Sequence, residues 1–287
     1  MAEALWVCEH GGVAEAAARE HVRVRWNGPS SEDAVDEQIA IAEKAIDNDT
    51  YGLVLSPNSL FAMNTVIQRA LRKDIPVVIV GASLPINAGG GLTFVLNDVD
   101  VAGQLAANHV KQVLREGDEV LVTGLDPTWP GSEDRARAFE KELNNVAPQI
   151  RIADKLSGAV SFGQAELQAE KALREHLKIG VVVSLNITST RGAVAAVSAL
   201  RASSHIRVMG FDQTLDLLTG LRQGRVDALV VQDMRIMGAM AVERVVATQR
   251  GEQPPARTLV KPVLVTRANI DTEAVQQVLR MDWRPRP

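Results

Sequence analysis

The chain contains a single cysteine, Cys8, among its 287 residues. One cysteine excludes an intramolecular disulfide and any metal site built from several thiolates, so we expect Cys8 to be a packed small residue. Long hydrophobic runs are missing too, since no stretch approaches the about 18–20 residues that a membrane-spanning helix needs. The composition, 46% hydrophobic and 23% charged, is that of an ordinary globular protein.

An excess of either charge is also missing. Lysine and arginine total 31 against 35 for aspartate and glutamate, a formal net charge of -4, and no basic run occurs. Proteins that bind nucleic acid cluster basic residues on one face or segment, so we expect no nucleic-acid partner. The opening MAEALWVCEH lacks a basic region followed by an apolar one, so we expect no signal peptide in it.

Motifs of the common enzyme classes form the third absence. No Gly-x-Gly-x-x-Gly follows the first predicted strand, and NAGGG (87–91) is not placed to open a helix. The P-loop lysine, His-Glu-x-x-His and Gly-x-Ser-x-Gly motifs do not occur either. The five histidines are isolated, and His109 is expected to be a satisfied or surface residue. We predict a protein without catalytic residues, bound metal or cofactor.

What the chain does have is a regular alternation of short hydrophobic runs and helical patterns. Each run has the length of a strand and is rich in valine and isoleucine. Runs that are apolar on both faces suit parallel strands covered by helices on both sides. We predict strands at 22–26, 52–56, 76–81, 93–97, 119–124, 150–156, 180–185, 206–211 and 227–232.

Amphipathic helical patterns fill the intervals, the first of them at 31–48 with Ser31 as its expected N-cap. Regular alternation of this kind predicts right-handed βαβ units and doubly wound sheets. The predicted strands fit two sheets better than one. The segment 96–104 is expected to cross between two similar lobes, and 250–266, with its proline pair and one strand, to be a second crossing.

The sequence thus predicts an α/β fold of two doubly wound, Rossmann-like parallel-sheet lobes joined by a hinge. We assign residues 1–101 and 235–256 to the first lobe, and residues 102–234 and 257–287 to the second. In open α/β sheets, ligands bind outside the carboxyl ends of the strands. Residues that follow strands are therefore the candidates for a binding site.

Polar side chains do gather at those ends. Asn58, Asn186, Asp212 and Gln232 each follow a predicted strand, and Arg135 opens a helix just beyond another. A carboxylate accepts two neighbouring hydroxyls, while amides and a guanidinium donate to ring and hydroxyl oxygens. The set is therefore suited to a neutral polyol.

Five segments in order and spacing extend this pattern: WNGPSSEDAVDEQIAIAEKAI (26–46), KDIPVVIVGA (73–82), SEDRARAFEKEL (132–143), VMGFDQT (208–214) and GRVDALVVQD (224–233). Together they resemble type I periplasmic sugar-binding proteins of the ribose-binding kind, the receptors of ABC importers. The resemblance covers nearly the whole chain and implies the periplasmic binding protein type I fold. It also implies a periplasmic monomer that closes on a monosaccharide and delivers it to the importer's membrane subunits.

The resemblance assigns a role to each candidate in the second lobe. Asp212 would accept sugar hydroxyls, Phe211 would help to wall the pocket, and Arg135 would donate to the sugar. Asn186 and Gln232 match the family's amide positions. Two simpler roles are open as well. Asp212 could only cap the helix that follows it, and Arg135 could pair with a glutamate on the surface.

Two tryptophans and an asparagine are further candidates. Trp6 matches an aromatic residue of the loop that enters the family's first helix, where a ring stacks on the sugar, but it could also be a core aromatic. Asn58 is open between contacting a ligand and only ending its strand. Trp129 is open between reaching the cleft and packing its own loop.

Two features depart from the family. Gly81 and Ala82 stand where the family carries an acidic residue, often followed by arginine or serine, which removes a partner for sugar hydroxyls. The chain also starts at the aromatic loop, without the strand that precedes it in the family. Because unpaired backbone groups at such a gap are costly, we expect the first lobe to be the less stable one.

Two other functions remain open from the sequence. The same fold serves as the effector domain of lac-repressor-type transcription regulators, which would need a helix-turn-helix that this chain does not contain. An α/β enzyme acting on a sugar or nucleotide would need a perturbed acid/base pair in its cleft. For that role Asp212 has no evident second catalytic group.

Overall fold

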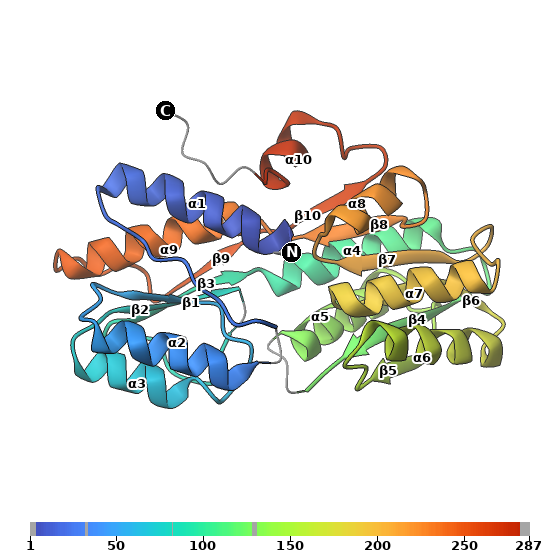
Figure 1. Ribbon diagram of the computed structural model, residues 1–287. Helices are drawn as coiled ribbons and strands as arrows, with labels where there is room; N and C mark the ends of the chain where they lie inside the picture. Colours follow the sequence, from blue (N-terminus) through green and yellow to red (C-terminus); the bar gives the residue numbers. More distant parts are fainter. Residues whose placement is uncertain (1–3, 32–33, 82, 128–130, 282–287) are drawn as a thin grey trace.

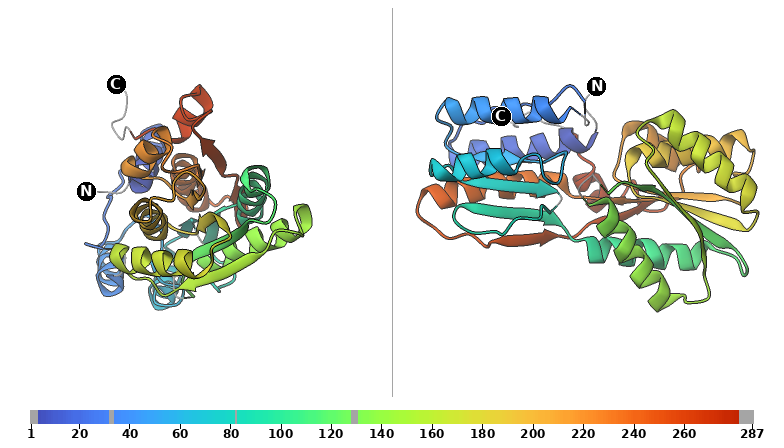
Figure 2. Two further views of the ribbon diagram at one scale, coloured as in Figure 1. Left: turned by 90° about the vertical axis from the view of Figure 1, so that its right-hand side faces the viewer. Right: turned by 90° about the horizontal axis from the view of Figure 1, so that it is seen from below.

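Two separate β-sheets, each flanked by helices, divide the molecule into two lobes (Figures 1 and 2). The computed structural model describes residues 4–31, 34–81, 83–127 and 131–281. The first sheet contains, in spatial order, β1 (Leu53–Leu55), β2 (Val77–Gly81), β3 (Leu92–Asn97) and β9 (Arg257–Val260). The second contains β10 (Val263–Thr266), β8 (Ala228–Val231), β7 (Arg207–Phe211), β6 (Ile179–Ser184), β4 (Glu119–Leu125) and β5 (Ile152–Ser157).

Neighbouring strands run parallel, except that β10 is antiparallel to β8. Helices α1 (Ala4–Glu20) and α9 (Met234–Gln249) cover one face of the first sheet, and α2 (Val35–Asp47) and α3 (Asn64–Arg72) the other. The predicted α/β fold of two doubly wound lobes is confirmed. The helices of the second lobe are α4 (Val99–Val113), α5 (Ser132–Val146), α6 (Phe162–Glu175), α7 (Ile187–Ala199), α8 (Leu215–Arg222) and α10 (Glu273–Val278).

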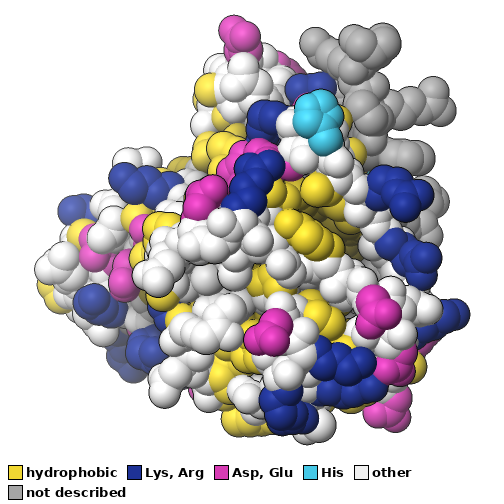
Figure 3. Space-filling view, turned by 90° about the vertical axis from the view of Figure 1, so that its left-hand side faces the viewer, with side chains coloured by type: hydrophobic (Ala, Val, Ile, Leu, Met, Phe, Trp, Pro, Cys, Tyr) yellow, Lys and Arg dark blue, Asp and Glu magenta, His cyan; other side chains and the backbone are white. Residues whose placement is uncertain are grey.

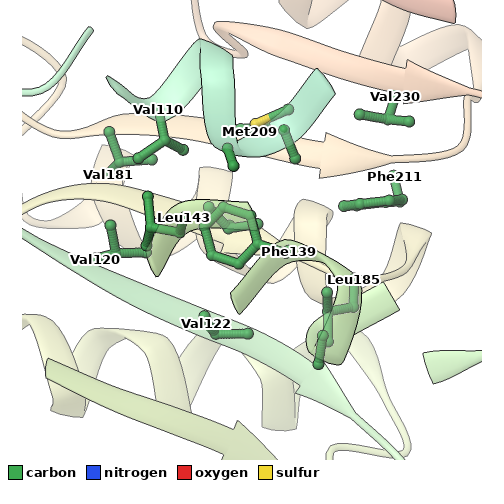
Figure 4. Close-up of a cluster of buried hydrophobic side chains, with 14 of the residues drawn as sticks. Val110, Val120, Val122, Phe139, Leu143, Val181, Leu185, Met209, Phe211 and Val230 are labelled. Atoms are coloured by element: carbon green, nitrogen blue, oxygen red, sulfur yellow. The ribbon is translucent and has the colours of Figure 1, made fainter. Parts of the chain in front are cut away.

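Alternate residues of a strand serve the two faces of a sheet. In β3, Phe94 packs toward α2 and α3 and Val95 packs toward α1 and α9. In the second lobe, Phe139 of α5 and Met209 of β7 are fully buried in the core shown in Figure 4. Phe211, the last residue of β7, belongs to the same core. The core therefore extends to the ends of the strands, where the candidate residues lie.

The chain crosses between the lobes after Asn97, after Val231 and after Val260. The first two crossings leave the carboxyl ends of β3 and β8 and enter a helix of the other lobe directly. The third joins β9 of the first sheet to β10 of the second. The carboxyl ends of the parallel strands in each lobe therefore face the other lobe, which places the strand exits of the two sheets opposite each other.

The lobe boundaries differ from those that the sequence predicts. Helix α4 starts at Val99, ahead of the predicted boundary at 102, and packs on β8 and β10 of the second sheet. Residues 257–260 form β9 and pair with β3, so they belong to the first sheet and not to the second. The one strand predicted in 250–266 is two strands, because Pro262 has no N–H with which to continue a ladder.

The predicted strand at 22–26 is wrong. These residues form no strand, and Val24 and Trp26 are 45% and 40% exposed. Strand β1 is the edge of the first sheet and, in the described part of the chain, pairs with β2 alone, so residues 22–26 do not join the sheet at its open edge. The ring of Trp26 lies instead against His10 of α1, with the centroids 4.6 Å apart.

Side chains cap helices in both lobes, and in the first lobe Asp233 caps α9. Side chains cap four helices of the second lobe, α4, α6, α7 and α8, through Asp98, Ser161, Asn186 and Thr214. Helix α2 of the first lobe begins at Val35, later than predicted, and Ala34 at its N-cap offers no side-chain bond. The predicted cap at Ser31 is therefore wrong.

The end of the first lobe carries charges of both signs, interspersed around a hollow floored by hydrophobic side chains (Figure 3). This face therefore has no single-sign patch, in keeping with the near-balanced composition of the chain. Within residues 4–281, leaving aside the short gaps in the description, no helix is long and apolar enough to cross a membrane.

Candidate functional site

Asp212 stands at the end of β7, where the chain turns out of the second sheet. Its N–H donates to the carbonyl of Val230, 2.9 Å away, and its φ of 66° lies in the left-handed region. Aspartate tolerates this region better than most residues because its short polar side chain can bond locally. The residue is 2% exposed, so a carboxylate is buried among the strand exits.

Arg135 and Gln232 supply the hydrogen bonds that a buried carboxylate needs. The guanidinium of Arg135 donates from Nη1 to Asp212 Oδ2 at 2.8 Å and from Nη2 to Oδ1 at 3.3 Å. The amide of Gln232, just after β8, donates to the same Oδ1. A buried ion pair is tolerated only with such complete bonding. Three elements distant in sequence are thus joined at one point.

Phe211 supports Arg135 from the core side. The guanidinium carbon of Arg135 lies 5.2 Å from the centroid of the Phe211 ring, a distance at which a cation is attracted to the ring face. Phe211 is 1% exposed and packs in the core of the second lobe. Its ring therefore helps to hold the guanidinium of Arg135 in place.

Asn186 is held by the start of α7. Its Oδ1 accepts from the N–H of Ser189 at 2.8 Å, and its Nδ2 donates to the carbonyl of Gly124, at the end of β4, at 3.1 Å. Gly124 has a φ of 85°, and a Cβ there would lie 2.9 Å from Asn186 Nδ2, so only glycine fits. Arg135 Nη1 also donates to the carbonyl of Leu185 at 2.7 Å. Side-chain bonds therefore reach the exits of β4, β6, β7 and β8.

The first lobe presents a different set at the exit of β1. Gln38 of α2 donates from Nε2 to the carbonyl of Ser56 at 2.9 Å and accepts at Oε1 from the N–H of Asn58 at 3.1 Å. The side chain of Asn58 is not used in this way. Its Oδ1 and Nδ2 are buried and find no hydrogen-bond partner in the described part of the chain.

Glu9, on α1, contacts the same strand exit. It is 2% exposed, and Ser56 Oγ donates toward its carboxyl group, 3.3 Å from Oε1 and 3.4 Å from Oε2. Burial raises the pKa of the Glu9 carboxyl to about 7, because the charged form loses its water, and the bond from Ser56 offsets this only in part. Sequence reasoning missed Glu9, since no local signal tells a buried helical glutamate from an exposed one.

Two more buried amides near the crossings were missed. Asn97 ends β3, is 5% exposed, and has no described partner for either polar side-chain atom. Gln213 follows Asp212, is 1% exposed, and its Nε2 lies 3.9 Å from the sulfur of Cys8. Because Cys8 is on α1, this contact joins the two lobes. Both amides lie at or just after the end of a strand, and this position in the sequence could have identified them.

Trp6 does not lie in a loop, so that part of the prediction is wrong. It stands in the first turns of α1 and packs, partly buried, against the core between α1, α9 and the first sheet. Its stacking on a sugar stays a prediction. Trp129 and Ala82 lie outside the described residues. At Gly81, whose φ is 91°, an added Cβ would meet no atom within 4 Å.

The simpler roles considered for Asp212 and Arg135 do not apply. Thr214, not Asp212, caps α8 with its side chain. Arg135 is 6% exposed and pairs with Asp212, so it is not a surface cation, while Glu140 pairs with Lys155 at 3.1 Å. As far as the chain is described, no group of three or more histidine, cysteine, aspartate or glutamate residues could hold a metal. The site offers hydrogen-bond acceptors and donors at facing strand exits.

A model of the family described as "Periplasmic binding protein domain" matches residues 6–253. The match spans most of the chain. The chain belongs to this family. The candidate residues of this periplasmic binding protein are divided between two facing walls, with Asn58 in the first lobe and Asn186, Asp212 and Gln232 in the second.

Known proteins similar to this periplasmic binding protein include a D-ribose/D-allose-binding protein of Pseudomonas aeruginosa, 25% identical over 232 residues, or 79% of this chain and 72% of the relative. A D-apiose import binding protein of Paraburkholderia graminis is 23% identical over 242 residues, or 83% and 76% of the two chains. Among solved structures, a solute-binding protein of an ABC transporter from Agrobacterium vitis, bound with alpha-D-tagatopyranose, has a TM-score of 0.88 at 19% identity, covering 97% of this chain and 95% of its own.

A carbohydrate transporter solute-binding protein from Agrobacterium radiobacter, in complex with D-arabinose, has a TM-score of 0.86 at 22% identity, covering 96% of this chain and 94% of its own. At these identities the structural likeness shows the fold. Together with the family match, it supports the receptor interpretation of this periplasmic binding protein over that of a transcription regulator.

Proposed function

We propose that this periplasmic binding protein binds a monosaccharide between its lobes and delivers it to the membrane subunits of an ABC importer. It works outside the cytoplasm, as a monomer, and does no chemistry on the ligand. The observation that carries the proposal is the buried carboxylate of Asp212, held by Arg135 and Gln232 at strand exits that face the other lobe. These bonds take three of the about four acceptor sites of the carboxylate, which leaves one on Oδ2 for a ligand hydroxyl.

The electrostatics of this wall favour a neutral ligand. The charges of Asp212 and Arg135 cancel each other, so a charged ligand would gain no unpaired countercharge there. Amides at Asn58, Asn186 and Gln232 can both donate and accept, which matches the hydroxyl groups of a sugar. The names of the similar proteins, which bind ribose, allose, apiose, arabinose and tagatose, support the same ligand class.

Closure of the two lobes would complete the site. We place the first lobe at residues up to 98 together with 234–260, and the second at 99–231 together with the residues from 263 on. The three crossings between them are short, as hinges are. A ligand that contacts both walls binds the closed state better than the open one, and this difference in affinity shifts the equilibrium toward closure. The closed form is then what the importer recognises.

The experiment that tests this proposal is thermal unfolding against a panel of D-ribose, D-allose, D-arabinose, D-tagatose, other hexoses, polyols and nucleosides. A ligand at about a hundred times its dissociation constant adds roughly 2.7 kcal/mol to the free energy of unfolding. We expect a clear rise in melting temperature for one sugar, and its loss in Asp212→Asn, which keeps the shape of the side chain.

The matched control is Asp216→Asn. Asp216 pairs with Arg191 on the surface of the same lobe, and neither is a candidate residue, so this variant should keep the sugar response. A chain that responds to nucleosides or to no sugar at all would contradict the proposal. A response that survives in Asp212→Asn would place the site elsewhere.

A further inference from the structure

The exit of β1 is an unusual place for a binding residue, because β1 is short and lies at the edge of the first sheet. It pairs with β2 on one side, and the described residues add no strand on the other. In the second sheet, the exits of β6, β7 and β8 each have strands on both sides. The segment Ser56–Pro57–Asn58 therefore lacks the backbone support that fixes the opposite wall.

The side chain of Gln38 takes the place of the missing neighbour. In a parallel pair, one residue donates its N–H to the carbonyl of residue i−1 and accepts at its own carbonyl from the N–H of residue i+1. The amide of Gln38 does the same around Pro57, donating to the carbonyl of Ser56 at 2.9 Å and accepting from the N–H of Asn58 at 3.1 Å. Pro57 itself has no N–H that would need a partner.

From α1, Glu9 holds the same segment through the hydroxyl of Ser56, at 3.3 and 3.4 Å. The segment is thus held from two helices, by groups that contact its backbone and its serine. Both polar atoms of the Asn58 side chain have no partner in the part of the chain that the structure describes. Buried amides are nearly always bonded, and one that is not calls for an explanation. A segment held this firmly keeps that amide from turning away to find a partner.

We propose that Gln38 is the positioning residue of the first wall, and that its side-chain amide holds Asn58 ready for a ligand hydroxyl. This inference rests on the proposed function, since it assigns the first wall of that site. Gln38 acts through Asn58 and does not touch the ligand. Arg135 and Gln232 differ from Gln38, because they bond directly to the side chain of Asp212 in their own wall.

A double-mutant cycle separates this role from a merely structural one. The variants are Gln38→Ala, Asn58→Ala and the two combined, with affinity for the sugar found in the panel measured by titration calorimetry. We expect each single variant to weaken binding roughly tenfold, the effect of about one lost hydrogen bond to a well-placed group. Gln38→Ala should then weaken binding less than about twofold further when Asn58 is already alanine.

Two further variants guard the test. Gln168→Ala removes a side-chain bond to the carbonyl of Ser157, at the end of the other sheet's edge strand, and should leave affinity unchanged. Gln38→Glu keeps an acceptor for the N–H of Asn58 but loses the donor to Ser56. It should therefore fall between wild type and Gln38→Ala.

Amide hydrogen exchange at Asn58 gives a readout that needs no ligand. Its N–H bonds to Gln38, so Gln38→Ala should speed its exchange without a general rise across the lobe. Additive losses of affinity in the cycle, or unchanged exchange at Asn58, would overturn the inference. If the wild type binds no sugar in the panel, the proposed function fails, and the exchange measurement alone decides whether Gln38 positions Asn58.

Discussion

The two walls of the candidate site meet their hydrogen-bonding needs in different ways. In the second lobe, Arg135, Asp212 and Gln232 bond to one another in one network. In the first lobe, the polar side-chain atoms of Asn58 and Asn97 are buried and have no partner among the described residues. The polar side chains of the second wall therefore bond to one another before a ligand arrives, whereas the first wall holds its backbone in place and leaves the side-chain amides for a partner.

This difference suggests a division of labour between the lobes. A preorganised wall binds with little loss of conformational freedom, so it suits first contact with the ligand. A wall with unbonded amides forms new hydrogen bonds when closure brings a ligand to it, and these bonds favour the closed state. Substitutions in the two walls should therefore change stability differently.

The largest effect is expected from Asp212→Ala. This change leaves the guanidinium of Arg135 buried without its counter-charge, and breaking a buried pair by removing one partner costs about 3–5 kcal/mol. Urea unfolding of the variant should show a loss of that size. Asp216→Ala, which removes an exposed ion pair in the same lobe, should cost less than about 1 kcal/mol. Equal losses would show that the Asp212 network adds nothing beyond a surface pair.

In the first wall, Glu9→Gln should raise stability at high pH, whereas Asp212→Ala lowers it. Burial raises the pKa of Glu9 from 4.5 to about 7, so between these values the folded protein binds more protons than the unfolded one. Stability is therefore lost as pH rises through this window, and the loss is complete above pH 7. Removing the titrating group should stabilise the protein there by an amount on the order of 3 kcal/mol.

The measurement is urea unfolding of wild type and Glu9→Gln at pH 4.5 and at pH 8.5. The gain should appear at the higher pH and nearly vanish at the lower one. Glu37→Gln is the control in the same lobe, because side-chain and backbone hydrogen bonds from Ser30 lower the pKa of this exposed carboxyl. It should give no gain at high pH. A gain for Glu9→Gln that is equal at both pH values would count against a buried, titrating carboxyl.

A pair of substitutions compares the two walls directly. Gln232→Met removes a donor to the buried carboxylate of Asp212 and should cost about 1–3 kcal/mol. Asn97→Val replaces an amide that makes no described side-chain bond by an apolar residue suited to a strand, and should stabilise by about 1 kcal/mol. Both are measured by urea unfolding. Changes of the same sign in the two variants would erase the distinction between the walls.

Much of the fold follows from local patterns in the sequence. Valine- and isoleucine-rich runs mark β2, β6 and β8, whose strands are buried on both faces. The same pattern failed at 22–26, because a strand needs a neighbour and that pairing is not local. It also failed at 250–266, where the partner of β9 is β3, far back in the sequence.

For the site, too, the sequence predicted the positions that follow from local patterns and missed those that depend on tertiary contacts. The ends of strands pointed to Asp212 and Gln232, since the fold alone puts those positions on one edge. That Arg135 bonds to Asp212, 77 residues away, depends on how α5 packs on the sheet. Glu9 and Gln38 carry no local sign of their role, because a helix face becomes a wall only through its tertiary neighbours. Such residues are identified by their contacts in the folded structure and not by their spacing in the sequence.

The smallest expected effects concern the helix starts that border the two walls. Asn186 caps α7 and bonds to Gly124, so Asn186→Ala should cost about 1 kcal/mol. Helix α2, which carries Gln38, has no side-chain cap at Ala34, so Ala34→Asp should stabilise by about 0.5 kcal/mol. Thermal unfolding resolves both. If Ala34→Asp also slows hydrogen exchange at Asn58, the stability of α2 controls how often the first wall opens locally. Unchanged exchange would mean that the amide of Gln38 holds this wall independently of how its helix begins.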